Sequence, residues 1–169
     1  LSDRIHKNIM SSLIYANANS LFDYSNGASR SLLLLLETWA AAGIKVYAIT
    51  SCVSDSEKGY EFSVNLWRSI QSSNDTRSPY IKKFKKNGVE HTLILNPSYM
   101  RQKLDNTIQE LIYRETESCL RNQKSPNNKT GFIGWGNLLL EESLFRRAND
   151  FGCKTIFYLT NPTYLGKRA

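Results

Sequence analysis

The order of apolar runs along the chain constrains the fold most, because short β-rich runs alternate with longer helical ones. Residues 9–15 predict a buried strand, and an apolar helix is expected over residues 28–42. Gly43 follows that helix, at a position where a residue free to adopt positive φ commonly ends it. Residues 44–49 then predict a second strand. A strand, a helix and a strand in succession form a crossover unit, in which the two strands lie parallel.

The same alternation continues along the rest of the sequence. Helices are expected over residues 60–71, 100–121 and 138–150, and strands over residues 89–95, 130–135 and 155–159. The stretch 60–71 also alternates like a strand, but the spacing of its later apolar residues favours a helix. The predicted fold class is α/β, a doubly wound and mainly parallel Rossmann-like sheet flanked by helices. The chain length suffices for one such domain, residues 1–169.

Composition excludes several other classes of protein. Hydrophobic residues make up 41% of the chain, and its longest aliphatic run is Leu32 to Leu36. A disordered chain and a membrane-spanning helix are therefore both excluded. The three cysteines show no C-x-x-C spacing, so neither a disulfide framework nor a zinc cluster is predicted, and a cytoplasmic location is expected.

The basic charge of the chain is a weak indication of its partners. The net charge of +7 favours phosphates, anionic lipid surfaces or acidic sugars without choosing among them. Basic residues cluster at residues 82–86 and at Arg146 and Arg147. Most such clusters are solvated faces, and binding to nucleic acid or to a membrane surface is kept as an alternative use.

The fingerprints of the common nucleotide-binding and hydrolytic sites are missing from the sequence. The turn before the first long helix contains a single glycine, and the predicted second strand ends at Thr50 and Ser51 without an acidic residue. NAD or FAD is therefore not expected, and the chain also lacks a P-loop and a G-x-S-x-G turn. The two histidines, His6 and His91, are more typical of solvated or capping residues than of catalysts.

In doubly wound folds, ligands bind at the carboxyl ends of the strands, where the strand order reverses. Three predicted loops reach that edge: residues 16–28, 133–137 and 160–164. The candidate binding residues on them are Asn26, Gly27, Ala28, Trp135, Gly136, Asn137, Thr160, Asn161 and Tyr164. Amides at a helix start suit an anion, whereas indole and carboxamide groups suit the faces and hydroxyls of sugars. The structural alternative is that the small residues only allow close packing and that the indole is packed inward.

Three stretches of the sequence form a pattern in the order in which they occur: residues 21–30, 40–46 and 140–164. Together they resemble the amino-terminal domain of a bacterial family-four glycosyltransferase of the GT-B fold. The resemblance covers most of the chain, and it rests on the order of the stretches and on their placement at strand ends.

The resemblance implies a retaining transferase that moves a sugar from a nucleotide-sugar donor to a glycan or lipid-linked acceptor in polysaccharide biosynthesis. This chain would be the acceptor-side domain, and it would need a carboxyl-terminal donor-binding domain to catalyse transfer. The implied enzyme is cytoplasmic, with peripheral contact at the inner membrane. No metal or other cofactor is implied, because helix dipoles and basic side chains can stabilise a leaving diphosphate.

The resemblance also implies roles for the three loops. Asn26, Gly27 and Ala28 would lie beside the donor diphosphate and the reacting sugar, and the loops at residues 135–137 and 160–161 would line the cleft. A histidine is common in the family where this chain has Thr160. Asn161 is therefore the polar neighbour to test first.

Two other functions stay open at this stage. A non-catalytic Rossmann-like module would bind a nucleotide or sugar tightly without a second domain. A nucleic-acid-binding protein would show an affinity that falls steeply with salt, because counterions are released on binding. The leading hypothesis includes no nucleic acid among the partners.

Overall fold

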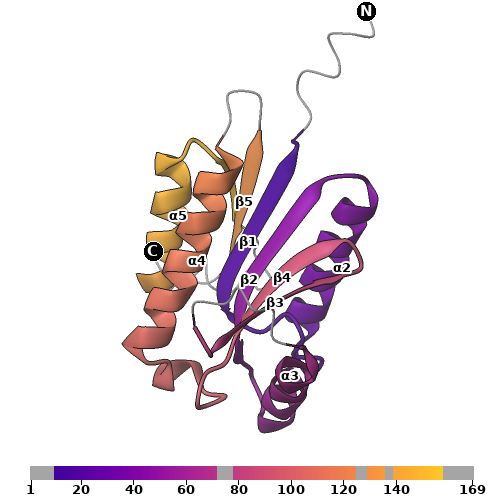
Figure 1. The fold of residues 1–169 in the computed structure, drawn as a ribbon, viewed down its shortest axis with the longest axis vertical. Helices are drawn as coiled ribbons and strands as arrows, with labels where there is room; N and C mark the ends of the chain where they lie inside the picture. Colours follow the sequence, from indigo (N-terminus) through magenta and orange to yellow (C-terminus); the bar gives the residue numbers. More distant parts are fainter. Residues whose placement is uncertain (1–9, 72–77, 125–128, 136–138, 158–169) are drawn as a thin grey trace, which may run out of the picture.

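A six-stranded sheet forms the centre of the computed structural model, which describes residues 10–71, 78–124, 129–135 and 139–157 (Figure 1). The strands lie in the order β3-β4-β2-β1-β5-β6. Their bounds are β1 (Ser12–Asn19), β2 (Lys45–Val53), β3 (Ile81–Lys86), β4 (Val89–Ile94), β5 (Thr130–Gly134) and β6 (Lys154–Phe157). Every neighbouring pair is parallel except β3 with β4, so the predicted α/β class with a mostly parallel sheet is confirmed.

Helices cover both faces of this sheet. Their bounds are α2 (Gly27–Ala41), α3 (Glu57–Ser69), α4 (Asn106–Gln123) and α5 (Leu139–Asp150), with a short 3-10 helix η2 (Arg101–Lys103) before α4. Helices α2 and α3 pack on one face, and α4 and α5 pack on the other (Figure 1). None of the helices that the structure describes combines the length and apolar content needed to cross a bilayer.

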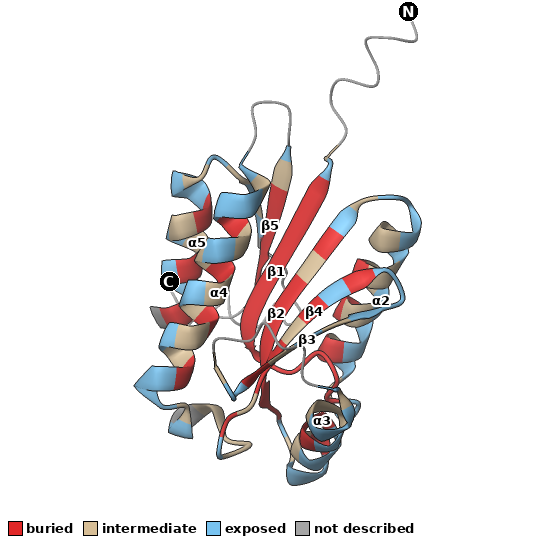
Figure 2. Ribbon diagram, in the orientation of Figure 1, coloured by how far each residue is buried: buried red, intermediate tan, exposed pale blue. Residues whose placement is uncertain are grey.

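The central strand β1 is buried along its whole length, as Figure 2 shows. Its side chains alternate between the two faces, so Leu13 packs in the α2 core and Ile14 in the core under α4 and α5. A strand covered on both faces has a nearly continuous run of apolar residues, and for this reason the sequence predicted that β1 is buried.

Strands β1 and β2 continue further toward their carboxyl ends than predicted. We expected a turn from residue 16, but β1 includes Asn17 and ends at Asn19. The Asn17 side chain accepts a hydrogen bond from the Asn19 backbone N–H at 2.8 Å, and the hydroxyl of Ser51 in β2 donates to the carbonyl of Ala18. The turn prediction for residues 16–19 was wrong because these buried polar groups find partners inside the protein.

The edge strand β3 is the element that the sequence analysis did not predict. Its lysine-rich run was interpreted only as a basic cluster. The two residues between β3 and β4, Asn87 and Gly88, have φ angles of 47° and 83° and form the tight hairpin turn. This Asn-Gly pair between two β-rich runs was the signal that could have revealed the strand. Lysines on an edge strand discourage pairing with another sheet.

His91 is buried in β4, which corrects the prediction of a solvated or capping residue. Its ring stacks on Phe84 at 5.0 Å between centroids and also meets Phe22 at 5.0 Å. Neither ring nitrogen has a hydrogen-bond partner among the described residues. Burial, together with the positive charge of Lys86, lowers the pKa of His91 to about 4.

The lowered pKa of His91 predicts a pH-dependent stability. The unfolded chain takes up a proton near pH 6.5 while the folded chain resists protonation down to about pH 4. Stability is therefore fully present above pH 6.5 and falls as the pH drops from 6.5 toward 4, by up to about 3 kcal/mol from this group. Urea denaturation across this pH range measures the loss. The variant His91→Phe should flatten that part of the profile, and an unchanged slope would contradict the assignment.

Candidate functional site

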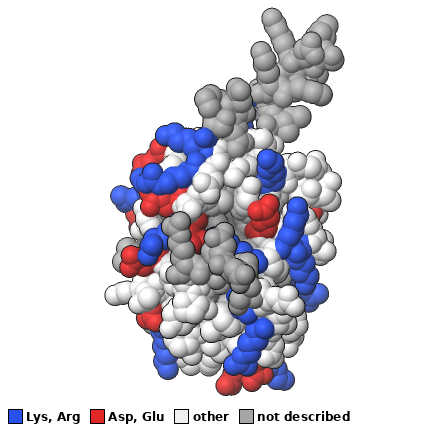
Figure 3. All heavy atoms as spheres, in the orientation of Figure 1, with Lys and Arg blue, Asp and Glu red and all other residues white. Residues whose placement is uncertain are grey.

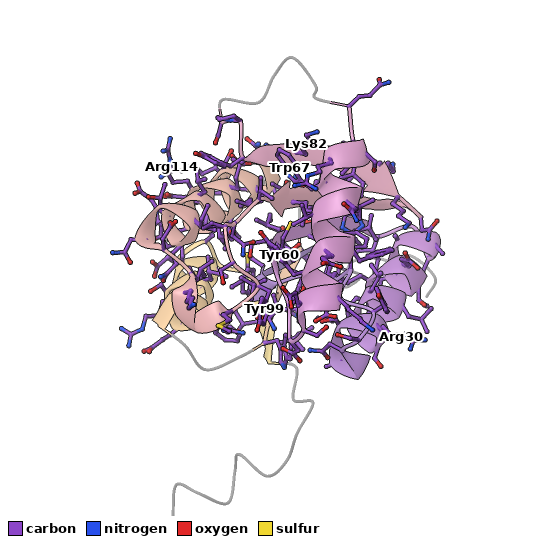
Figure 4. The ribbon with its side chains drawn as sticks, turned by 90° about the horizontal axis from the view of Figure 1, so that it is seen from below. Arg30, Tyr60, Trp67, Lys82, Tyr99 and Arg114 are labelled. Atoms are coloured by element: carbon purple, nitrogen blue, oxygen red, sulfur yellow. The ribbon has the colours of Figure 1, made fainter. Side chains whose placement is uncertain are left out.

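The carboxyl ends of the parallel strands meet at one edge of the sheet, and Figure 4 looks onto this edge. From β1, the chain winds outward through β2 and β4 on one side and through β5 and β6 on the other. The strand order therefore reverses between β1 and β5. In open α/β sheets, the crevice outside this reversal is where ligands bind.

The first predicted loop leads into the amino terminus of α2 at this edge, and Asn26 caps that helix. The Asn26 side-chain oxygen accepts hydrogen bonds from the backbone N–H of Ala28 at 2.8 Å and of Ser29 at 3.2 Å. Its amide nitrogen donates to the Asp55 carboxylate at 2.6 Å. A Cβ atom built at Gly27 would meet nothing within 4 Å. The chain itself thus occupies two of the helix-start amides, and there is open space beside Gly27.

A buried carboxylate, Asp23, joins this loop to the loop between β2 and α3. One of its oxygens accepts from the backbone N–H and the hydroxyl of Ser25, and the other accepts from the backbone N–H of Asp55 at 2.8 Å. The hydroxyl of Ser25 also lies 2.8 Å from that of Ser56, which caps α3 through the N–H of Gly59. Both Asp23 oxygens have partners in the protein, so this carboxylate holds the two loops together.

Asp55 is an acidic residue just beyond the end of β2, which the sequence analysis did not place there. The strand was expected to end earlier, so an acid at its end was missed. Partial burial and the nearby negative charge of Asp23 raise the pKa of Asp55, whereas Arg101 and the hydrogen bond from Asn26 oppose the rise. The hydrogen bond to Asn26 ties this carboxylate to the α2 cap.

Polar side chains also gather at the reversal point between β1 and β5. The amide nitrogen of Asn17 donates to the carbonyl of Trp135, the residue after β5. The guanidinium of Arg101, in η2, donates to the Asn19 side-chain oxygen at 2.8 Å and to the carboxylate of Glu141, in the first turn of α5. Asn17, Asn19 and Glu141 are all more than nine-tenths buried. Four elements of the fold are thus tied together through polar groups at this point.

Two of the three predicted loops therefore reach the same edge. Asn26, Gly27 and Ala28 lie on the β2 side of β1, and Trp135 follows β5 on its other side. The Trp135 ring is half-buried and packs against the core cluster under α2. Five other predicted site residues lie outside the described part of the chain: Gly136, Asn137, Thr160, Asn161 and Tyr164.

The sequence analysis missed the polar residues of the reversal point. Asn17 and Asn19 close an otherwise apolar strand, and two asparagines at the end of a buried run were the available signal of a polar cluster there. Arg101 and Glu141 are 40 residues apart, and their pairing leaves no local pattern.

The predicted basic clusters make contacts within the protein. Lys82 donates to the Ile70 carbonyl and lies 4.4 Å from the Trp67 ring centroid, and Figure 4 shows Lys82 and Trp67 side by side. Lys83 pairs with Glu115 at 2.6 Å. Two further pairs join Arg146 to Glu142 and Arg147 to Glu117. On the face shown in Figure 3, blue and red side chains are interleaved.

Metal and thiol chemistry have little basis at the described residues. No group of three or more histidine, cysteine, aspartate or glutamate side chains is placed there to hold a metal ion. Burial raises the pKa of Cys52 and of Cys119 to about 12, so both thiols stay protonated at neutral pH.

Comparisons with protein-family models, with curated proteins and with solved structures give no match for this chain. The geometry of the edge therefore carries the argument about function.

The two glycines of this edge predict opposite effects of a methyl group. A Cβ at Gly59 would lie 2.2 Å from an Asp23 oxygen, whereas a Cβ at Gly27 would meet open space. Gly59→Ala should destabilise the protein by about 1–3 kcal/mol, because the Asp23 carboxylate and the loops bonded to it would have to move. Gly27→Ala is the matched control, and it should keep the stability of the parent within about 0.5 kcal/mol. Urea unfolding of the three proteins measures the difference, and equal stabilities would show that Asp23 does not hold the loops.

Proposed function

We propose that this chain is the acceptor-side domain of a retaining, nucleotide-sugar-dependent glycosyltransferase that acts on a glycan or lipid-linked acceptor in polysaccharide biosynthesis. The observation that carries the proposal is the open space beside Gly27, at the same sheet edge as Trp135 and across the reversal point from it. The order of the sequence stretches that resemble family-four glycosyltransferases supports the same function.

The chemistry of this edge suits the two parts of a nucleotide sugar. The positive end of the α2 dipole favours the negatively charged diphosphate near Gly27. An indole group such as that of the half-buried Trp135 suits the apolar face of a sugar ring. In the proposed transfer, the bond from the sugar's anomeric carbon to the diphosphate breaks and a bond to the acceptor oxygen forms. The diphosphate leaves with the bonding electrons and takes up the proton that the acceptor hydroxyl loses.

The second wall of the cleft would come from the donor-binding domain. This chain alone should therefore bind its ligands weakly and should not turn them over. Contact with the inner membrane surface, where a lipid-linked acceptor would be met, is part of the same proposal.

The two alternative functions would each require a different kind of binding surface. A non-catalytic module would need a site that is complete within this chain. A nucleic-acid-binding protein would need a free basic face, whereas Lys82 and Lys83 of β3 are engaged with Ile70, Trp67 and Glu115. On the face that Figure 3 shows, positive and negative side chains are interleaved rather than gathered by sign.

Titration of the isotopically labelled chain with a panel of nucleotide sugars tests the proposal. UDP-glucose, UDP-N-acetylglucosamine and GDP-mannose are the probes, and nuclear magnetic resonance follows the amides of Gly27 and Ala28 and the indole of Trp135. We expect at least one probe to shift these signals with a dissociation constant on the order of millimolar or weaker, because in the proposed enzyme a donor-binding domain supplies the other wall of the cleft. No sugar should be transferred by this chain alone.

A variant at Gly27 sharpens this test. Gly27→Leu fills the open space, so the protein should fold normally while the binding of the nucleotide sugar is lost. Ser31→Leu adds the same side chain to an exposed position one turn further along α2, and it should bind like the parent. Equal binding by both variants would remove the α2 terminus from the site.

Other outcomes distinguish the competing functions. Sugar transfer by this chain alone would contradict its role as half of a cleft. Tight, stoichiometric binding of a nucleotide would favour a self-contained binding module. Binding of an oligonucleotide that weakens steeply with added salt would favour a nucleic-acid-binding protein.

A further inference from the structure

Two aromatic side chains meet on the surface of the protein next to the start of α2. Tyr24 lies in the loop between β1 and α2, and Phe62 lies in the second turn of α3. Their ring centroids are 5.1 Å apart, and the ring planes cross at 82°. The two residues are nevertheless 51% and 46% exposed. Half-exposed aromatic rings retain apolar area that a ligand can cover.

This aromatic pair borders the same edge of the sheet as the open space at Gly27. Tyr24 precedes the α2 cap, Asn26, by two residues, and the Asn26 N–H donates to the carbonyl of Asp23 at 3.1 Å, which bends the chain between them. Figure 1 shows α3 beside the carboxyl ends of the strands and next to the beginning of α2. The aromatic pair and the α2 terminus therefore lie on the same side of the strand reversal.

The backbone on both sides of the aromatic pair is held in place by hydrogen bonds. Asp23, the residue before Tyr24, accepts from the backbone N–H of Ser25 at 3.0 Å and of Asp55 at 2.8 Å. The hydroxyl of Ser25 lies 2.8 Å from that of Ser56, the cap of α3. Because the two rings project from segments that are bonded to each other, little backbone order has to be gained when a ligand binds.

A polar group that can bind hydroxyls lies in the same pair of loops. Asp55 is exposed, and its carboxylate accepts one hydrogen bond, at 2.6 Å, from the amide nitrogen of Asn26. A carboxylate can accept several hydrogen bonds, so this one leaves capacity for the hydroxyls of a ligand. A sugar ring has an apolar C–H face and hydroxyls at its rim, and aromatic rings with a neighbouring carboxylate match both.

We propose that Tyr24 and Phe62 form a platform on which a neutral sugar ring of the acceptor stacks. This inference rests on the proposed function, and it adds where the acceptor binds and which class of sugar it offers there. The stacked ring would lie next to the space at Gly27, where the donor diphosphate is proposed. The negative charge of Asp55 selects against acidic sugars, because it repels a carboxylate on the ligand.

Titration of the full, isotopically labelled chain with methyl glycosides tests the platform, and nuclear magnetic resonance follows the ring signals of Tyr24 and Phe62. The probes are methyl glycosides of glucose, galactose and mannose, with methyl glucuronide as the acidic sugar. At least one neutral glycoside should shift both ring signals in a saturable way, and failure of all three overturns the proposal. The glucuronide should bind at least about threefold more weakly than the best neutral glycoside, and added salt should narrow this difference. Equal binding of the glucuronide at low salt would overturn the selection by Asp55.

Variants of the two rings and of a third tyrosine complete the test. Tyr24→Ala and Phe62→Ala should each weaken binding of the neutral glycoside by about fivefold or more, whereas Tyr24→Phe keeps the ring and should stay within about twofold of the parent. Tyr80→Ala is the matched control, because Tyr80 is 48% exposed but precedes the outermost strand β3, and its binding should be unchanged. Equal effects of Tyr24→Ala and Tyr80→Ala would overturn the proposal. If Tyr24→Ala does not fold, the comparison of Phe62→Ala with Tyr80→Ala decides.

The failure of this inference can be separated from that of the proposed function. If nucleotide sugars shift Gly27 and Trp135 while no glycoside shifts Tyr24 and Phe62, the platform is wrong and the glycosyltransferase proposal stands. If glycosides shift both rings while no nucleotide sugar shifts the edge, the chain binds sugars on the platform and the glycosyltransferase proposal fails. Uridine is a control for stacking by a base, and a shift of both rings by uridine but by no glycoside would also overturn the platform.

Discussion

The burial of β1 on both faces is the constraint on which the rest of the structure depends. A strand between two layers of helices has no access to water along its length, so its polar residues must lie at an end and must find partners there. Asn17 and Asn19 meet this requirement at the carboxyl end. Their partners come from the segment after β5 and from η2. The need of these buried asparagines for hydrogen-bond partners therefore brings polar groups from distant parts of the chain together at the strand reversal.

The edge has two joints of different character. On the β2 side, both oxygens of the Asp23 carboxylate accept hydrogen bonds from neighbouring loops, and the carboxylate holds these loops together. On the β5 side, Arg101 binds both Glu141 and Asn19, while its Nε–H and the Glu141 Oε2 have no partner among the described residues. A buried ion pair is weak evidence for stability, because desolvation offsets its attraction. Both contacts tie segments that are far apart in the chain to the same edge of the sheet.

Most of the fold could be predicted from the sequence, because each helix and each central strand has its own periodicity. The hydrophobic run before Gly43 and the apolar spacing of α4 are local patterns. Helix α2 lies where the periodicity placed it, whereas α4 begins at Asn106, later than the predicted residue 100, because the 3-10 helix η2 precedes it. The edge strand β3 was missed because its lysines hide the alternation, although Asn87 and Gly88 marked the hairpin. His91 was placed wrongly because a single polar residue gives no local sign of the aromatic rings packed around it.

The sequence by itself determined the α/β class and the order of the main helices and parallel strands, and it predicted the sheet edge at which a site should lie. These follow from local periodicity and from the handedness of crossovers. Only the tertiary structure decided which side chains meet there. Glycine and asparagine at the start of α2 could be singled out from their turn propensity. The pairing of Arg101 with Glu141 and Asn19 could not be predicted in this way. These residues are far apart in the chain, and they come together only when β1, η2 and α5 are placed side by side in the folded domain.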